Sequence, residues 1–368
     1  MALPVDVRTA FQPAGHQVTS NSSITTMEGH IPVVDFDPYG LSKDNVNEAD
    51  LQPLADKLVH TFATVGFVYL VNTGIQRSES EELFGVADRF FDLPLDVKEK
   101  YARPQDKTRN RHGWVCVARE SPIPLYRSNL ETLGNLKEAF DINMPLSEGQ
   151  TWPTEVPEFK DKVVTFYEKC RRLDMRILEL IGRGLHIPDV PGFLSMFKFM
   201  GRGANSTTLS ALRYPPVPDD VNEKQMRCGE HTDWGAVTLL FQDGVPGLEV
   251  MNKEGDYKPA PYVPGSVLVN IGDMLQRWSG DKLVSTKHRV VMPESEADRK
   301  SFRRSIAFFT HPDEDTRLVC LDGSNKYDPI TAKHHDTRLV CLDGSNKYDP
   351  ITAKQHVQQK LNWSYLDT

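Results

Sequence analysis

Apolar residues in the first half of the chain recur at helical steps. Leu54, Leu58 and Phe62 stand four positions apart, and residues three or four apart lie on one face of an α-helix. This periodicity predicts helices over 51–65, 81–91 and 158–185, the last being the longest. Runs of β-forming residues predict strands over 31–36 and 66–72. We therefore expect a mainly helical N-terminal region that contains two strands.

From about Thr207 onward the pattern changes to short β-rich runs separated by turn residues. The predicted strands are 207–214, 235–242, 247–251, 256–260, 266–271, 285–291, 303–310 and 316–321. Many short strands at this spacing are typical of a β-sandwich or jelly roll. The predicted fold class is accordingly α+β, with a mainly β core, flanking helices and an N-terminal helical region.

These patterns divide the chain into three regions. Residues 1–28 are polar and rich in Ser and Thr, without an apolar core or a basic start, which predicts a disordered extension and no targeting signal. Residues 29–195 are the N-terminal region, and 196–368 are the β core. Within the N-terminal region the stretch 103–135 predicts a long loop, and such loops in compact domains often have a function.

The β core contains a tandem duplication. Residues 315–335 and 336–356 are 21-residue units that differ only in His334 against Gln355. Two nearly identical units do not form a solenoid, which needs at least three repeats. A recent in-frame duplication or an error in the gene prediction explains the near-identity. We expect the surplus residues to form a surface excursion.

Composition and charge limit the classes of molecule that the chain is expected to bind. The chain is 39% hydrophobic and 26% charged, so it can bury a core under a polar surface. A formal net charge of −8 without a basic run argues against nucleic acid or an anionic membrane as a partner, and no apolar run approaches a membrane span. The five cysteines show no C-x-x-C spacing, which indicates reduced thiols. We expect a monomeric, cytoplasmic protein that acts on a small molecule.

The segment Glu230-His231-Thr232-Asp233-Trp234-Gly235 carries the candidate chemistry. His231 and Asp233 are two positions apart, so an extended backbone directs both side chains to one face. A third ligand from a later strand, for which His288 is the candidate, would complete two imidazoles and one carboxylate. This ligand set leaves adjacent metal positions open and is the one found in non-haem Fe(II) oxygenases.

The H-x-D spacing alone is weak evidence. The chain has two further triplets, His311-Pro312-Asp313 and His334-His335-Asp336, so the spacing arises as background and needs structural context. Cys228, three residues before His231, is interpreted as a half-buried thiol, because sulfur ligation would favour other metals. The surrounding strand pattern favours the first triplet.

Arg303 and Ser305 share one face of the predicted strand 303–310, and Arg304 points to the other. A charged residue on a buried strand face is costly without a partner. Either this face is exposed, or it receives a carboxylate, which a guanidinium binds bidentately and a hydroxyl binds by one further hydrogen bond.

Together these pieces resemble the Fe(II)/2-oxoglutarate-dependent dioxygenases of the isopenicillin N synthase and gibberellin-oxidase type. The matching pieces are His231-x-Asp233, His288, Arg303-x-Ser305, Leu212-Arg213-Tyr214-Pro215-Pro216, 264–273 and 31–36. The resemblance covers about residues 30–365. One departure is Arg213, where many relatives carry Asn, and it leaves the matched ligand positions unaffected.

The resemblance implies a double-stranded β-helix, a jelly roll with a metal at one open end. The implied Fe(II) ligands are His231, Asp233 and His288. The residues implied to bind the distal carboxylate of 2-oxoglutarate are Arg303, Ser305 and Tyr214, although a Tyr before Pro-Pro can equally pack in the core. The implied activity is oxidation of a C–H bond of a small metabolite, with O2 and 2-oxoglutarate as cosubstrates and succinate and CO2 as products. Hydroxylation is expected first, with desaturation or ring closure as alternatives.

Two other classes stay open. A zinc hydrolase can use two His and one Asp with a metal-bound water as nucleophile, but it would have no use for Arg303 and Ser305 behind the metal. A non-catalytic binding or sensing module would keep the fold and lose turnover. The presence of every ligand position argues against that module.

Overall fold

The computed structural model describes residues 31–104, 111–116, 135–218, 226–324 and 326–327, together with the backbone of four two-residue strands outside these ranges. Most of the predicted extension 1–28 and most of the predicted loop 103–135 lie outside the described residues. One of the four short strands, β1 (Thr25–Thr26), pairs with β2.

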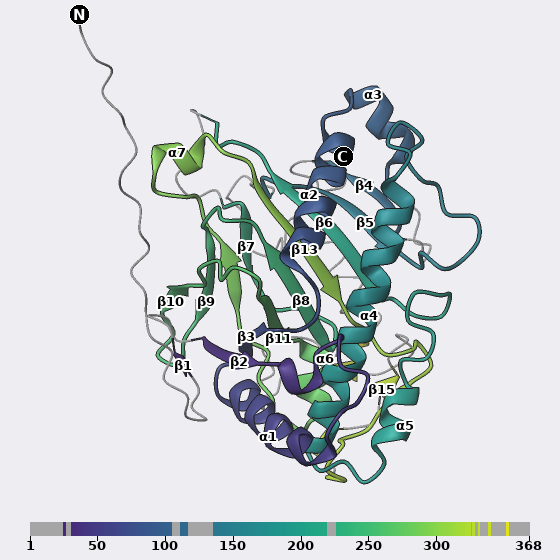
Figure 1. The fold of residues 1–368 in the computed structure, drawn as a ribbon, viewed down its shortest axis with the longest axis vertical. Helices are drawn as coiled ribbons and strands as arrows, with labels where there is room; N and C mark the ends of the chain where they lie inside the picture. The colour runs from purple at the N-terminus through teal and green to yellow at the C-terminus, as the bar shows by residue number, and fades with distance from the viewer. Residues whose placement is uncertain are drawn as a thin grey trace, which may run out of the picture.

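Two β-sheets form the centre of the molecule (Figure 1). The large sheet has the order β1-β2-β3-β11-β8-β13-β6-β5-β4, and the small sheet has the order β10-β9-β12-β7. The large sheet contains β2 (Pro32–Asp35), β3 (Phe67–Val71), β4 (Gly113–Val115), β5 (Glu138–Asn143), β6 (Thr208–Tyr214), β8 (Val237–Gln242), β11 (Val267–Ile271) and β13 (Arg303–Phe309). The small sheet contains β7 (Cys228–His231), β9 (Leu248–Met251), β10 (Tyr257–Pro259) and β12 (His288–Val290).

Buried side chains from both sheets form one inner cluster. Val250 and Val290 of the small sheet pack with Leu268 and Ala307 of the large sheet. Neighbouring strands are antiparallel except β2 and β3, which are parallel. Two facing, mainly antiparallel sheets with an apolar interior are the walls of a jelly roll, which confirms the predicted fold class.

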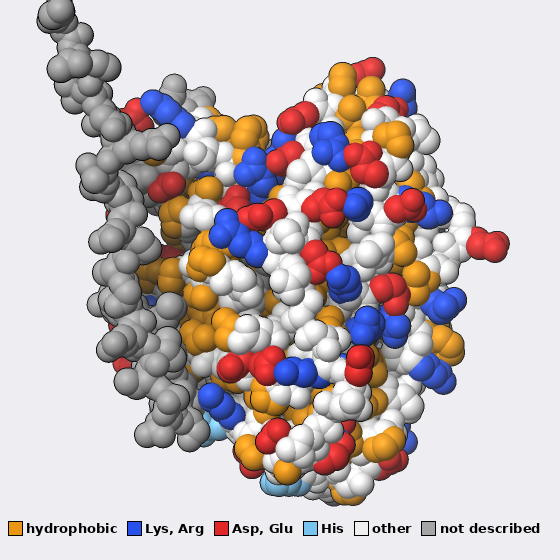
Figure 2. Space-filling view, in the orientation of Figure 1, with side chains coloured by type: hydrophobic (Ala, Val, Ile, Leu, Met, Phe, Trp, Pro, Cys, Tyr) orange, Lys and Arg blue, Asp and Glu red, His pale blue; other side chains and the backbone are white. Residues whose placement is uncertain are grey.

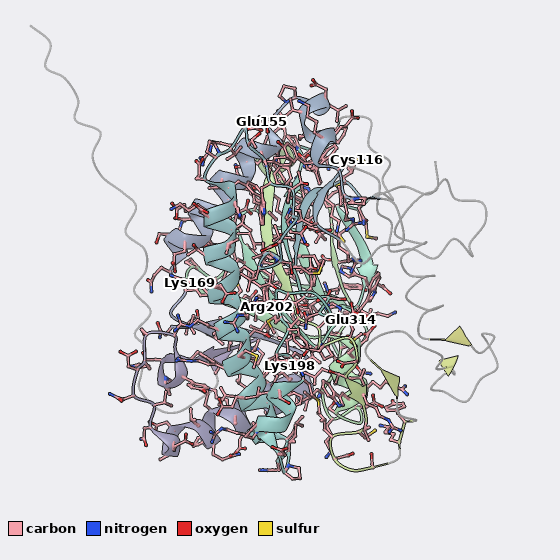
Figure 3. The ribbon with its side chains drawn as sticks, turned by 90° about the vertical axis from the view of Figure 1, so that its right-hand side faces the viewer. Cys116, Glu155, Lys169, Lys198, Arg202 and Glu314 are labelled. Carbon is pink, nitrogen blue, oxygen red and sulfur yellow. The ribbon has the colours of Figure 1, made fainter. Side chains whose placement is uncertain are left out.

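Helices cover the outer face of the large sheet (Figure 1). The long helices on this face are α1 (Glu48–Thr64), α2 (Arg77–Phe91) and α4 (Phe159–Gly184). The shorter helices are α3 (Leu95–Lys98), α5 (Val190–Ser195), α6 (Asp273–Trp278) and α7 (Glu296–Arg299), with 3-10 turns η1 (Asp37–Tyr39) and η2 (Glu99–Tyr101). The apolar stripe of α4 packs on the sheet, where the rings of Phe166 and Phe241 lie 5.0 Å apart. Lys169 lies on the outer side of α4 and pairs with Glu79 (Figure 3).

The predicted helices are present with small changes in their bounds. The main one is α2, which begins at Arg77 rather than 81 because Gln76 and Glu79 form a reciprocal cap at its start. The prediction of a loop throughout 103–135 is wrong at β4, which pairs with β5. The patterns also do not predict β5 or β7. Of the predicted strand 316–321, only β14 (Arg317–Leu318) is formed.

Strands from the N-terminal region belong to the same sheet as the core strands. β3 pairs with β11, and β5 pairs with β6. The regions 29–195 and 196–368 therefore share hydrogen-bonded ladders, and the N-terminal region supplies part of the wall around the site.

Positive and negative side chains are interspersed over α2 and α4 on the face shown in Figure 2. The pairs there include Lys162 with Glu82 and Lys169 with Glu79. Among the described residues, no helix combines the length and the hydropathy needed to cross a bilayer.

Each unit of the duplication forms the same small hairpin. In the first unit β14 pairs with β15 (Ile330–Thr331), and in the second β16 (Arg338–Leu339) pairs with β17 (Ile351–Thr352). Glu314, visible in Figure 3, immediately precedes the first unit.

The described part of the first unit is docked on α6 and the turn after it. Leu318 and Cys320 are buried, and the Leu321 amide donates to the Trp278 carbonyl at 2.8 Å. Lys326 pairs with Asp281 at 2.7 Å. Because the second unit repeats this sequence, it carries every residue that makes these contacts.

We expect the protein lacking 315–335 to keep its melting temperature. The deletion joins Glu314 to Asp336, so Leu339, Cys341 and Leu342 replace the docked residues with identical ones, and shortening a surface excursion removes little besides loop-closure entropy. The measurement is a thermal melt.

The matched control for this deletion removes both units, 315–356. That protein exposes the surface around Trp278 and should melt at a lower temperature than either the full chain or the single deletion. A single deletion that melts as low as the double deletion would show that the two units are not interchangeable.

Candidate active site

Strand pairing brings two histidines together at one end of the small sheet. His231 ends β7, His288 begins β12, and the two are direct partners in the antiparallel ladder. Their ring centroids lie 4.2 Å apart. Asp233 follows β7 by two residues, and its Oδ1 lies 3.9 Å from His231 Nε2 and 3.7 Å from His288 Nε2. The three ligand atoms therefore all lie within 4.8 Å of one another.

The backbone fixes which nitrogen of each imidazole faces the cluster. His231 Nδ1 lies 2.8 Å from the Gly229 carbonyl oxygen, and His288 Nδ1 lies 3.1 Å from the Thr286 carbonyl oxygen. A carbonyl oxygen only accepts, so each Nδ1 carries a proton and donates it to the backbone. In both residues Nε2 is the nitrogen left to bind a metal.

The two imidazoles differ in their protonation. Burial, with the nearby charge of His231 second, lowers the pKa of His288 to about 4, so this ring is neutral at physiological pH. Burial also lowers the pKa of His231, but the neighbouring Cys228 and Asp233 outweigh it and raise that pKa to about 9. A metal that binds His231 Nε2 therefore displaces a proton from it.

Two side chains hold the carboxylate of Asp233 in place. Its Oδ2 accepts hydrogen bonds from Thr238 Oγ1 and from Asn270 Nδ2, each at 2.7 Å. Burial opposes ionisation of this group, but the two imidazoles and these hydrogen bonds together lower the pKa of Asp233. The carboxylate is ionised, with Oδ1 directed toward the two histidines.

Replacing Asn270 with Ala or Thr238 with Val should weaken Fe(II) binding roughly 10- to 100-fold, the usual effect of removing a partner that orients a metal ligand. The measurement is a titration of the protein with Fe(II) under anaerobic conditions. Thr232→Val is the matched control, because the Thr232 hydroxyl bonds Asp273 at 3.1 Å instead of a predicted ligand. Equal loss in the control would show that the effect is not transmitted through Asp233.

The other candidates for metal binding do not join this group. The carboxylate of Asp313 accepts from the Phe199 amide and from Asn205 Nδ2 at 2.9 Å, so it stabilises a loop. The triplet His334-His335-Asp336 lies outside the described residues. Cys228 is buried with Sγ 4.0 Å from His231 Nδ1. Among the described residues, only His231, Asp233 and His288 form a cluster of this kind.

The donor set fits Fe(II). Two imidazole nitrogens and one carboxylate oxygen on one side of a metal leave adjacent positions for other ligands. Each donor is already oriented by a hydrogen bond on its far side, as expected of a site built for a metal rather than an accidental cluster.

Arg303 lies on the inner face of β13 and is 1% exposed. Its Nη2 donates to Gln242 Oε1 at 2.8 Å, and no described residue accepts from its Nε or Nη1. Tyr214 is its direct partner on β6, and the Arg303 guanidinium lies 4.9 Å from the Tyr214 ring centroid. Ser305, two residues further along β13, is also 1% exposed. The exposed-face interpretation of Arg303 and Ser305 is therefore wrong.

Arg304 confirms the register of β13. It points to the opposite face, where its Nε lies 2.6 Å from Asp88 Oδ2 of α2. The guanidinium of Arg303 is thus buried with donor nitrogens that have no described acceptor, whereas that of Arg304 is paired with a carboxylate.

Sequence patterns do not single out the residues that orient Asp233. Asn270 lies within the matched stretch 264–273 and Thr238 within a predicted strand, so the only signal is a polar residue on an otherwise apolar strand. Arg111 lies close to the site, with its guanidinium 5.9 Å from the ring centroid of Trp234, the residue after Asp233.

The chain matches two family profiles. The 2OG-Fe(II) oxygenase superfamily profile matches residues 205–312, and the profile described as non-haem dioxygenase in morphine synthesis N-terminal matches residues 31–160. Among curated proteins, proline hydroxylase buaE of Petromyces alliaceus is 34% identical, over 76% of this chain and 88% of that protein. The 2-oxoglutarate-dependent dioxygenase htyE of Aspergillus rugulosus is 32% identical, over 72% of this chain and 83% of that protein.

Solved structures show the same architecture. A full-length Neurospora crassa protein, solved in complex with alpha-KG and thymine, superimposes with a TM-score of 0.73 at 29% identity, over 84% of this chain and 97% of that one. The chain thus belongs to the 2OG-Fe(II) oxygenase superfamily, as a 2-oxoglutarate-dependent dioxygenase that uses Fe(II) and O2 to oxidise a small organic substrate.

Proposed function

We propose that His231, Asp233 and His288 hold the Fe(II), and that Arg303, Ser305 and Tyr214 bind the distal carboxylate of 2-oxoglutarate. The observation that carries this assignment is the buried Arg303, which has two donor nitrogens without an acceptor among the described residues and lies on the inner wall of the roll that holds the ligand cluster. A dicarboxylate that reaches from the metal to Arg303 satisfies both ends of the site at once.

Some residues of the site bind the metal, and others exclude water from it. Bound Fe(II) supplies activation of O2, by which 2-oxoglutarate is oxidised to succinate and CO2 and a substrate C–H bond becomes C–OH. The Nε2 atoms and Asp233 Oδ1 keep the metal at one end of the roll. The inner cluster, which includes Val250, Val290 and Ala307, excludes water from the site.

The first experiment is a metal analysis of the purified protein combined with a succinate assay. Iron at one equivalent and succinate formation that depends on 2-oxoglutarate are expected. A zinc hydrolase would hold zinc and form no succinate, and a non-catalytic module would bind 2-oxoglutarate without consuming it. The buried, unsatisfied Arg303 and the dioxygenase relatives both favour the oxygenase over these alternatives.

We further propose that the substrate is a small ring compound that contains nitrogen and that it is hydroxylated. Support comes from the names of two relatives, a proline hydroxylase and a structure that holds thymine. In this chain Trp234 provides a flat aromatic surface beside a metal ligand, and Arg111 adds a positive charge next to it.

A substrate panel tests this proposal. L-Proline, thymine and related nitrogen rings are compared with nitrogen-free rings of similar size and with open-chain amino acids. Substrate-dependent succinate release is the first readout, and gain of one oxygen atom in the product by mass spectrometry is the second. Turnover confined to nitrogen-free or open-chain compounds would refute the substrate class while leaving the iron assignment intact.

We also propose that the protein is a cytoplasmic monomer. The described cysteines, Cys116, Cys170, Cys228 and Cys320, are free thiols, as a reducing compartment permits. Light scattering after gel filtration and fractionation of the source cells are the tests. A stable dimer would contradict the monomeric state, and recovery of the protein outside the cytoplasm would contradict the location.

A further inference from the structure

A second arginine, Arg227, is buried as completely as Arg303. It lies directly before β7 and is 0% exposed. Its Nη2 donates to the carbonyl oxygens of Pro215 at 3.3 Å and Ser301 at 3.2 Å. In the described part of the chain, nothing accepts a hydrogen bond from its Nε or Nη1. Two donor nitrogens of a fully buried cation are thus left without a described acceptor.

The two carbonyl contacts place Arg227 beside the Arg303–Tyr214 pair. Pro215 follows Tyr214 at the end of β6, and Ser301 precedes Arg303 by two residues at the start of β13. Arg303 and Tyr214 are direct partners across these two strands. The guanidinium of Arg227 is therefore anchored to the backbone of both strands, just beyond the Arg303–Tyr214 pair that we assign to the distal carboxylate.

Neither buried guanidinium is paired with a carboxylate of the described residues. Burial, and after it the positive charge of Arg303, lowers the pKa of Arg227 to about 10, so the Arg227 guanidinium is protonated at neutral pH. Asp298 acts on Arg227, and Asp243 acts on both Arg227 and Arg303. The oxygens of Asp243 already accept from the Val245 amide at 3.0 Å and the Arg304 amide at 2.7 Å. No described carboxylate forms an ion pair with either guanidinium, and two buried, unpaired cations are costly unless an anion joins them.

We propose that Arg227 and Arg303 together bind the distal carboxylate of 2-oxoglutarate, which makes Arg227 a second cosubstrate-binding residue and specifies a 2-oxo dicarboxylic acid. This inference rests on the assignment of Arg303 to the cosubstrate. One carboxylate supplies the missing negative charge and accepts from the leftover donors of both guanidiniums. A 2-oxo acid without that carboxylate would leave both cations unsatisfied.

The test measures ligand binding instead of turnover. Titration calorimetry under anaerobic conditions, with Mn(II) in place of Fe(II), compares 2-oxoglutarate with 2-oxopentanoate, which has a methyl group where 2-oxoglutarate has its distal carboxylate. In Arg227→Gln we expect the Kd for 2-oxoglutarate to rise roughly 10- to 100-fold, as for loss of a charged hydrogen bond. The Kd of this variant for 2-oxopentanoate should stay unchanged. The Kd of Arg227→Lys for 2-oxoglutarate should lie between those of Arg227→Gln and the natural protein.

Arg289→Gln is the matched control, since Arg289 of β12 is paired with Glu249 at 2.7 Å on the same sheet. Equal weakening of both 2-oxo acids in Arg227→Gln would mean that Arg227 is only structural, and an unchanged Kd for 2-oxoglutarate would also overturn the proposal. If Arg227→Gln does not fold, a crystal structure of the natural protein with Mn(II) and 2-oxoglutarate decides, by whether the distal carboxylate lies within hydrogen-bond distance of Arg227. Failure of the natural protein to bind 2-oxoglutarate at all would instead refute the cosubstrate assignment.

Discussion

Replacement of His231, Asp233 or His288 by Ala should each remove bound iron and abolish oxidation. Each substitution takes away one of three protein ligands, and we expect the remaining two to bind Fe(II) too weakly to retain it during purification. Because the loss of a mere supporting partner already costs about 10- to 100-fold in metal affinity, the loss of a ligand should exceed that range. The measurements are iron content after gel filtration and succinate release under saturating 2-oxoglutarate.

His311→Ala is the control for these variants. His311 belongs to an H-x-D triplet whose Asp313 accepts a hydrogen bond from Asn205 and is not part of the ligand cluster, so the variant should keep its iron. A folded His311→Ala protein without iron, or an Asp233→Ala protein with a full equivalent, would show that the metal lies elsewhere.

The elements whose pattern is set locally could be predicted from the sequence. The stripe of α4 and the apolar runs of β11 and β13 show which residues form them, because one side of each faces a core. β5 could not be found this way, since Glu138 and Asp141 interrupt its apolar pattern. Glu138 is buried because Arg213 Nη2, at 2.9 Å, and Lys98 Nζ, at 3.0 Å, approach it from other elements. Only tertiary structure supplies such partners.

The same ion pair accounts for the departure from the family at Arg213. This arginine on β6 binds Glu138 on β5 and reaches Asp92 beyond α2 at 2.5 Å. Its side chain therefore ties the sheet to the helical layer, on the side away from the ligand cluster. The departure changes packing and leaves the metal ligands intact.

The sequence identified which residues form the candidate site, but it did not show how they are arranged in space. Three H-x-D triplets look alike in the sequence, and what separates the first from the second is the pairing of β7 with β12, which places His288 opposite His231. An extended backbone does not explain the whole cluster, because β7 ends at His231. Asp233 reaches the cluster from the turn that follows, held there by Thr238 and Asn270.

Replacing Arg303 with Ala should weaken 2-oxoglutarate binding by about 2–5 kcal/mol, the cost of truncating one member of a buried charge pair. That corresponds to roughly 30- to several-thousand-fold in Kd, since about 1.4 kcal/mol is tenfold. The side chain is 1% exposed, so its truncation leaves the carboxylate without its charged partner in a buried site. Arg303→Lys keeps the charge but loses the planar guanidinium, so its Kd for 2-oxoglutarate should lie between those of Arg303→Ala and the natural protein.

Arg304→Ala is the matched control, one residue along the same strand. Its side chain faces α2 and pairs with Asp88, so the variant should bind 2-oxoglutarate as the natural protein does and melt only slightly lower, because partly exposed ion pairs contribute little. Both variants are compared by anaerobic calorimetry with Mn(II) and by thermal melts. Loss of 2-oxoglutarate binding in Arg304→Ala together with retention in Arg303→Ala would place the cosubstrate on the other face of β13. Retention in both would mean that Arg303 does not contact the distal carboxylate.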